Sequence, residues 1–248
     1  MTHKAAIFVA LGTLAGCIGP PTPAPDPITI TNGQGEIAGE VTADAVILQS
    51  RLTTEAVLVD GDVPGAPGVA RFELALSEDF ASLTESPWLD ATAEDDYVVK
   101  ALMDGLTAGT RYFYRLRYGP TQRNTRVGPT RSFSTLGGAD DTSEVNFVVV
   151  TGMNYAQFHG NGPRAGSPQD RALGYPALET ILGRDPEFFV ATGDNVYYDV
   201  PFARFERTQT FLRKKWHEQL VQPRFIDLFA KVPTYWEKDD HDYRYNDC

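Results

Sequence analysis

The last residues of the chain, KDDHDYRYNDC from Lys238 to Cys248, concentrate side chains that bind metal ions. Asp239, Asp240, His241 and Asp242 follow one another directly after an apolar segment. Carboxylate oxygens and an imidazole nitrogen suit hard or borderline cations such as Mn²⁺, iron, Ca²⁺ or Zn²⁺. The run therefore predicts part of a metal site.

A second group of candidate ligands is the segment GDNVYYD, residues 193–199, which offers Asp194, Asn195, Tyr197, Tyr198 and Asp199. It also follows an apolar segment. Because ligands bind past the carboxyl ends of strands in an open α/β sheet, we expect the two groups to meet at one sheet edge. Taken alone, a Gly-Asp turn or an Asp-rich loop is ordinary surface chemistry, so only the pair of groups indicates a site.

The segments that position these groups are continuous apolar runs separated by helical patterns. The runs read as strands are Asn146–Gly152, Glu187–Asp194 and Val232–Asp240. The helical patterns fall at residues 176–182, 202–220 and 223–231. Continuous apolar strands that alternate with helices argue for a parallel sheet covered on both faces. We therefore predict an α/β domain over residues 145–248.

One of these helical patterns, FLRKKWHEQL, carries a cluster of basic residues. Arg213, Lys214 and Lys215 would attract an anionic substrate, but a solvated helix face is the default interpretation. His217 is interpreted as a surface or partly buried helix histidine rather than a ligand.

Residues 28–137 have a different pattern, typical of an all-β sandwich. Short β-branched and aromatic runs are separated by Gly, Pro, Asp and Asn. These runs are ITITNG, EVTADAVILQSRL, ARFELALS, YVVKALMDGL, RYFYRLRYG and TRSFSTL. Residues 105–119 resemble the end of a fibronectin type III-like domain, in which Leu106 and Tyr112 would hold a corner between two strands. An aromatic ligand platform of Tyr112, Tyr114 and Tyr118 is the alternative, although alternating aromatics usually pack a sheet.

The first residues indicate export. Residues 1–16 contain an apolar run that is shorter than the about 20 residues needed to span a bilayer but fits a signal peptide. LAGC, which ends at Cys17, resembles the bacterial lipobox, and this resemblance implies a lipid on Cys17. An ordinary signal peptide or a buried hydrophobic helix is the alternative. The Pro-rich residues 17–27 would form an extended tether. We expect an exported protein anchored by its lipid alone, at the outer membrane or elsewhere on the cell surface or in the periplasm.

Composition limits the remaining options. A chain of 248 residues with 42% hydrophobic residues suits two ordinary domains. The formal net charge of −11 opposes binding to a nucleic-acid backbone. The chain's 2 cysteines exclude a disulfide framework.

The two candidate groups together resemble the calcineurin-like metallophosphoesterase superfamily, and within it the alkaline phosphatase D (PhoD-like) branch. The matching motifs are Gly193-Asp194-Asn195-Val196-Tyr197 and Asp239-Asp240-His241-Asp242. A β-sandwich ahead of the catalytic domain is also characteristic of this branch, and residues 39–53 resemble its opening strands. The resemblance, which runs from about residue 35 to the end, implies a multidomain fold. A fibronectin type III-like sandwich would precede the first part of an α/β metallophosphoesterase domain, a β-sandwich flanked by helices.

The resemblance also implies roles for individual residues. Asp194 would bridge two metals, Tyr197 would be a phenolate ligand of a ferric ion, and Asp240 would bind the second metal. His241 would stabilise or protonate the departing group. Two or more divalent or trivalent ions are implied, iron and calcium first, with manganese and zinc as alternatives, and the substrate would be a small phosphate ester. Further candidate ligands are Asn154, Asn195, Asp239 and Asp242.

One position departs from the family pattern. PhoD-like enzymes usually have Ser-Cys-Gln at the end of the first strand, with the cysteine as a ligand, and here Gly152 stands in its place. Either Asn154 or another residue substitutes, the metal set differs, or the site is altered. The family's later histidine ligands, including one in an Asp-x-His motif, have no counterpart in the sequence. We therefore expect an N-terminal portion of a longer enzyme that is inactive by itself.

Two functions follow from these observations. The first is metal-dependent hydrolysis of phosphate esters by an exported, PhoD-like lipoprotein. The alternative is a non-catalytic surface lipoprotein with a β-sandwich interaction module and a degenerate or truncated phosphatase domain. Gly152 favours the alternative, whereas the intact GDNVYYD and DDHD motifs oppose it.

Overall fold

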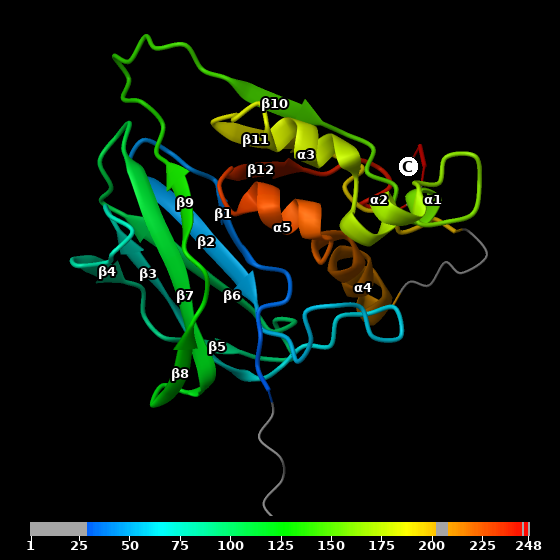
Figure 1. Cartoon of the computed structure of the whole chain (residues 1–248), viewed down its shortest axis with the longest axis horizontal. Helices are drawn as coiled ribbons and strands as arrows, with labels where there is room; N and C mark the ends of the chain where they lie inside the picture. Colours follow the sequence, from blue (N-terminus) through cyan, green and yellow to red (C-terminus); the bar gives the residue numbers. More distant parts are fainter. Residues whose placement is uncertain (1–28, 202–207, 245, 248) are drawn as a thin grey trace, which may run out of the picture.

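The computed structural model describes residues 29–201, 208–244, 246 and 247 (Figure 1). The predicted signal peptide (residues 1–16), the lipidation site Cys17 and the tether (residues 17–27) lie outside the described residues. Within the described ranges no helix has the length and apolarity that a membrane crossing requires.

Strands dominate the first part of the described chain, as predicted. They are β1 (Glu36–Gly39), β2 (Ala45–Arg51), β3 (Gly68–Ala75), β4 (Leu83–Glu85), β5 (Leu89–Ala91), β6 (Val98–Asp104), β7 (Arg111–Thr121), β8 (Asn124–Val127) and β9 (Arg131–Ser134). Within the predicted run ITITNG, the described residues 29–33 form only an isolated bridge between Thr31 and Thr53. The run EVTADAVILQSRL is shorter as a strand than predicted, because the Thr42 hydroxyl accepts from the Ala45 N–H at 2.9 Å and stabilises a turn before β2.

Strands and helices alternate in the second part. They are β10 (Phe147–Val150), α1 (Tyr155–Phe158), α2 (Pro168–Leu173), α3 (Pro176–Leu182), β11 (Phe188–Thr192), α4 (Gln209–Leu220), α5 (Pro223–Phe229) and β12 (Thr234–Glu237). The predicted strand order holds, and β10, β11 and β12 are parallel neighbours as expected. α1 and α2 were not predicted.

The strands of the described chain belong to two large sheets. One is a 6-stranded sheet in the order β10-β11-β12-β1-β2-β6, and the other contains β4-β3-β7-β8, with β5 and β9 attached. The first sheet crosses the predicted domain boundary, because β1 pairs in parallel with β12 at Gly39 and Thr234. The division between residues 137 and 145 stays a prediction.

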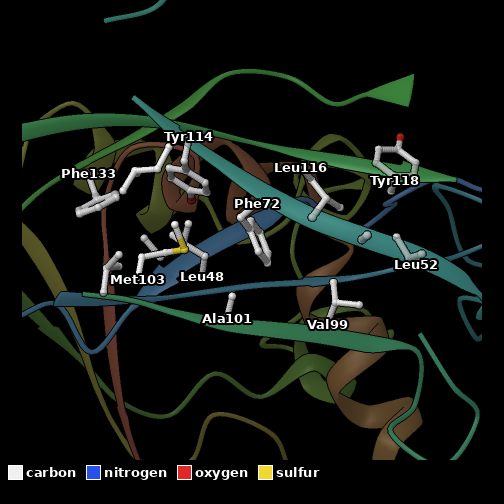
Figure 2. Packing of buried hydrophobic residues seen from close by; sticks show 14 of the residues in the cluster. Leu48, Leu52, Phe72, Val99, Ala101, Met103, Tyr114, Leu116, Tyr118 and Phe133 are labelled. Carbon is white, nitrogen blue, oxygen red and sulfur yellow. The ribbon is translucent and has the colours of Figure 1, made fainter. Parts of the chain in front are cut away.

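The first hydrophobic core lies between the two sheets (Figure 2). Its largest members include Phe72, Leu116 and Tyr114, which are fully buried. Every second residue of β7 points inward, so Tyr112 and Tyr118 are buried on the same face as Tyr114. The alternative prediction of an aromatic ligand platform is therefore wrong, because these rings pack the sandwich interior.

The second core lies between the helices and one face of β10, β11 and β12. Phe189 and Ala191 of β11 are fully buried there, together with Phe225 and Leu228 of α5 and Leu178 of α3. Figure 1 shows α3 and α5 beside these strands. This packing fixes the strands whose ends carry both candidate motifs.

Helix α4 connects the sandwich to the second part of the chain. His217 is buried, with Nδ1 at 2.7 Å from Asp62 Oδ1 and Nε2 at 2.6 Å from Asp96 Oδ2. Lys215 is also buried, and its Nζ donates to Val200 O at 2.9 Å. The prediction of a solvated face is wrong for Lys215, because this side of α4 packs against neighbouring loops and the ammonium group has partners there.

The predicted corner between β6 and β7 is confirmed. The Thr107 N–H donates to Tyr112 Oη at 2.9 Å, and Leu106 packs against the sandwich core. Removing the hydroxyl leaves this N–H without its partner. We expect Tyr112→Phe to lower the free energy of unfolding by about 1 kcal/mol in urea denaturation. Tyr243→Phe is the control because that ring is 72% exposed; equal effects of the two changes would contradict the assigned role.

Candidate metal centre

The two candidate motifs meet because their strands are adjacent and parallel. β11 ends at Thr192 and β12 ends at Glu237, and these two residues are register partners. The loops that follow therefore leave the sheet at the same edge, as the sequence predicts. The loop after β10 lies beside them, since the Met153 N–H donates to Asp194 O at 2.9 Å.

Gly193 makes the close approach of the two loops possible. Its φ is +93°, and a Cβ at this position would lie 2.3 Å from Asp239 Cβ and 2.8 Å from Asp239 N. A larger residue therefore requires the loops to separate. The next residue, Asp194, also has a positive φ of 53°. This conformation is uncommon outside glycine and is tolerated best by Asp and Asn.

Asp242 ties the two loops together. It is 3% exposed. Its Oδ2 accepts from Asn195 N at 3.1 Å and from Asn195 Nδ2 at 2.7 Å, and its Oδ1 accepts from Asp239 N at 2.6 Å. Asn195 Nδ2 also donates to Glu237 O at 2.7 Å. Asp242 and Asn195, which the sequence offers as further ligands, therefore brace the site, and the buried Asn195 Oδ1 has no hydrogen-bond partner among the described residues.

The structure brings together three predicted site residues. Asp194, Asp240 and His241 each offer one ligand atom, and these atoms lie within 4.8 Å of one another. Tyr197 lies beside them: its Oη donates to Asp194 Oδ2 at 2.9 Å, and its ring centroid is 4.2 Å from that of His241. The other oxygen, Asp194 Oδ1, is buried without a hydrogen-bond partner in the described part of the chain.

Burial and like charges govern the electrostatics of this group. Burial raises the pKa of Asp194, and the neighbouring carboxylates Asp240 and Asp239 add to this rise. Burial and the hydrogen bond to Asp194 raise the pKa of Tyr197, so its phenol stays protonated in the absence of a cation. The backbone N–H of Asp247 lowers the pKa of Asp240. A bound cation would relieve the repulsion among these groups.

His241 contacts a carboxylate to which the family resemblance assigns no role. Its Nδ1 lies 2.8 Å from Asp199 Oδ1, and Asp199 is buried. Asp199 Oδ2 accepts from the Asn246 N–H at 3.2 Å. Asp199 closes the GDNVYYD segment, but nothing in the sequence indicates that it pairs with a histidine on the next strand end.

The remaining candidates lie at the margin of the group. Asn154 caps α1, where its Oδ1 accepts from the Gln157 N–H at 3.0 Å. Asp239 is exposed and accepts from the Asp240 N–H at 2.9 Å. A Cβ built on Gly152 would lie 3.8 Å from Tyr197 Oη. Position 152 therefore adjoins the site, and this chain has no side chain there to contribute a ligand.

Comparison with known proteins gives a family match in the first part of the chain. Residues 25–134 match the family model described as "PhoD-like phosphatase, N-terminal domain". The chain carries the N-terminal domain of the PhoD-like phosphatases. No curated protein matches the sequence significantly.

Solved structures show the fold of the PhoD-like chain over most of its length. The structure of PhoD matches with a TM-score of 0.64 and 18% identity, covering 89% of this chain and 40% of PhoD. Purple acid phosphatase PPD1 from yellow lupin matches with a TM-score of 0.56 and 14% identity, covering 85% of this chain and 35% of that protein. The PhoD-like chain therefore spans well under half the length of either protein.

Gly193 provides a test of the local geometry of the PhoD-like chain. We expect Gly193→Ala to lower the free energy of unfolding by about 1–3 kcal/mol, because the added methyl group collides with Asp239. Urea denaturation measures the change. The control is Gly138→Ala, since a Cβ at Gly138 meets nothing within 4 Å. An unchanged stability for Gly193→Ala would show that the loops do not approach as described.

Proposed function

We propose that this chain is part of an exported, lipid-anchored phosphoric-ester hydrolase that depends on metal ions. The observation that carries the proposal is the convergence of Asp194, Asp240 and His241 next to a PhoD-like N-terminal domain. In this proposal the second part of the chain is the beginning of the α/β metallophosphoesterase domain, and the first part is its fibronectin type III-like sandwich. Cys17 would carry the lipid.

The donor atoms suit a metal ion. Asp194 would hold it through Oδ1, which is buried and has no hydrogen-bond partner within the described ranges. Asp240 would supply a second carboxylate, and Tyr197 would supply its phenol oxygen after losing the proton that it donates in its hydrogen bond to Asp194. These oxygen donors favour hard cations. Position 152 is a glycine and therefore provides no thiolate ligand. When bound, the cations would supply charge neutralisation at the phosphoryl oxygens and a water of lowered pKa.

His241 would act on the departing alcohol. The hydrogen bond between its Nδ1 and Asp199 Oδ1 fixes the orientation of the ring. Nε2 is then the atom that gives a proton to the leaving oxygen. Tyr197 packs against the ring at 4.2 Å between centroids and limits its rotation. Asp199 would therefore be a positioning residue, and His241 the proton donor.

The rival function is a non-catalytic surface lipoprotein with a degenerate phosphatase domain. Gly152 favours it, because this position adjoins Tyr197 and brings no ligand to the site. Asp242 accepts hydrogen bonds from both motif loops, and this arrangement favours the hydrolase over a degenerate domain. The metal content of the natural protein separates the two functions.

Asp194 tests metal binding directly. We expect Asp194→Asn to lower the bound metal of the purified natural protein at least tenfold, measured by inductively coupled plasma mass spectrometry, since a charged donor is lost. Asp227→Asn on α5 is the matched control because it removes the same charge at an exposed position. Equal metal content in all three proteins would refute the proposed centre.

The His241–Asp199 pair tests the mechanism. In the natural protein we expect His241→Ala to lower kcat by about 10²- to 10⁴-fold, as for loss of a general acid. Asp199→Asn should lower kcat by about 10- to 100-fold, with metal content retained. Hydrolysis of p-nitrophenyl phosphate gives these rates. A normal kcat in both variants would rule out the proposed proton transfer.

A further inference from the structure

His217 joins α4 to two loops of the sandwich. Its side chain is buried, with Nδ1 at 2.7 Å from Asp62 Oδ1 and Nε2 at 2.6 Å from Asp96 Oδ2. Asp62 lies in the loop between β2 and β3, and Asp96 lies in the loop between β5 and β6. We call His217, Asp62 and Asp96 the α4 clasp. Both ring nitrogens are therefore used, and each faces a different carboxylate.

The protons on the ring limit these two contacts. A neutral imidazole has one N–H donor, and its other nitrogen is an acceptor. An ionised carboxylate is an acceptor only, so a neutral His217 ring bonds one aspartate and turns a lone pair toward the other. Distances as short as 2.6 and 2.7 Å are typical of charge-assisted hydrogen bonds. Two such bonds to ionised aspartates require a ring with two N–H groups.

The sandwich side of the α4 clasp contains a further cation. Arg51 Nη2 lies 3.1 Å from Asp96 Oδ1, and the Arg51 side chain is also buried. Burial acts to raise the pKa of Asp96, but hydrogen bonds from His217 and Arg51 outweigh it, so this pKa is lowered and the carboxylate is ionised. A doubly protonated ring and Arg51 together balance the charges of Asp62 and Asp96. A neutral ring would leave one negative charge in excess in this buried group.

The charged residues of α4 have contacts of their own. Lys215 Nζ lies 3.1 Å from Glu218 Oε1, so the carboxylate that α4 carries is already paired. Arg213 donates at 3.1 Å to a backbone carbonyl of the loop between β5 and β6. Lys214 approaches the loop between β2 and β3. In the part of the chain that the structure describes, the carboxylates bonded to the His217 ring are therefore those of the sandwich.

We propose that the α4 clasp is a proton-dependent lock, in which the His217 ring carries two protons and thereby holds α4 against the sandwich. Loss of one ring proton as the pH rises leaves a carboxylate facing a lone pair in a buried contact, which weakens the attachment of α4. The α4 clasp also weakens as the pH falls, because the pKa of Asp96 is lowered in the folded protein and its protonation removes these bonds. This inference goes beyond the proposed function and does not depend on metal binding.

Nuclear magnetic resonance of the natural protein with nitrogen-15 in its histidine rings tests the protonation state. Two protonated ring nitrogens give similar shifts, whereas a neutral ring gives one protonated and one unprotonated nitrogen. The signal of His217 is the one missing from His217→Gln. We expect both nitrogens of His217 to be protonated at pH 7. A neutral ring at pH 7 would overturn the proposal.

Hydrogen–deuterium exchange of the α4 peptide, residues 209–220, tests the lock itself. Raising the pH until the His217 ring is neutral should speed exchange in α4 at least about tenfold beyond the chemical effect of pH. In Asp62→Asn the neutral ring can accept from the new amide and donate to Asp96, so we expect this extra exchange to disappear.

Asp227→Asn is the matched control, since it removes the same charge at an exposed position of α5 and should behave like the natural protein. Exchange in α4 that ignores ring deprotonation, or an equal pH response in Asp62→Asn and Asp227→Asn, would contradict the lock. Neither measurement requires metal or turnover. A failure of the proposed hydrolase function is therefore distinguishable from a failure of the lock.

Discussion

The candidate centre depends on the parallel pairing of β11 with β12. The register from Phe189 and Thr234 to Thr192 and Glu237 brings two strand ends to the same level. Apolar burial on the helical side holds this register, because a slip of one residue would turn Phe189 outward. Gly193 then lets the loops approach, and Asp242 bonds both of them. The carboxylates are thus held near one another by the sheet, despite their mutual repulsion.

The sandwich takes part in the same arrangement. β1 pairs with β12, so the strand that leads to Asp240 is supported on both sides. Helix α4 adds a second connection: Trp216 Nε1 donates to Tyr198 Oη at 2.9 Å, next to Tyr197, while His217 contacts loops of the sandwich. The motif loops are therefore connected to the sandwich through paired strands and through α4.

The sequence predicted the elements that have strong local signals. Continuous apolar runs predicted β10, β11 and β12. The motif residues lie, as predicted, just after the ends of β11 and β12. The sequence could not predict which carboxylates accept hydrogen bonds from other protein groups. Asp242 reads as a ligand but binds backbone N–H groups, and Asp199 joins His241 across the sheet edge. Lys215 reads as a solvated residue and is buried with partners. The Asn195–Asp242 and Asp199–His241 hydrogen bonds join residues 47 and 42 positions apart, which periodicity does not encode.

The most direct test of the account is the position of a bound ion. Crystals of the natural protein grown with Mn²⁺ would give an anomalous difference map in which each ion site is visible. The account predicts a peak bonded to Asp194 and Asp240, with the His241 ring still paired to Asp199. A map with no peak at this sheet edge, or with the ion held elsewhere on the chain, would contradict it.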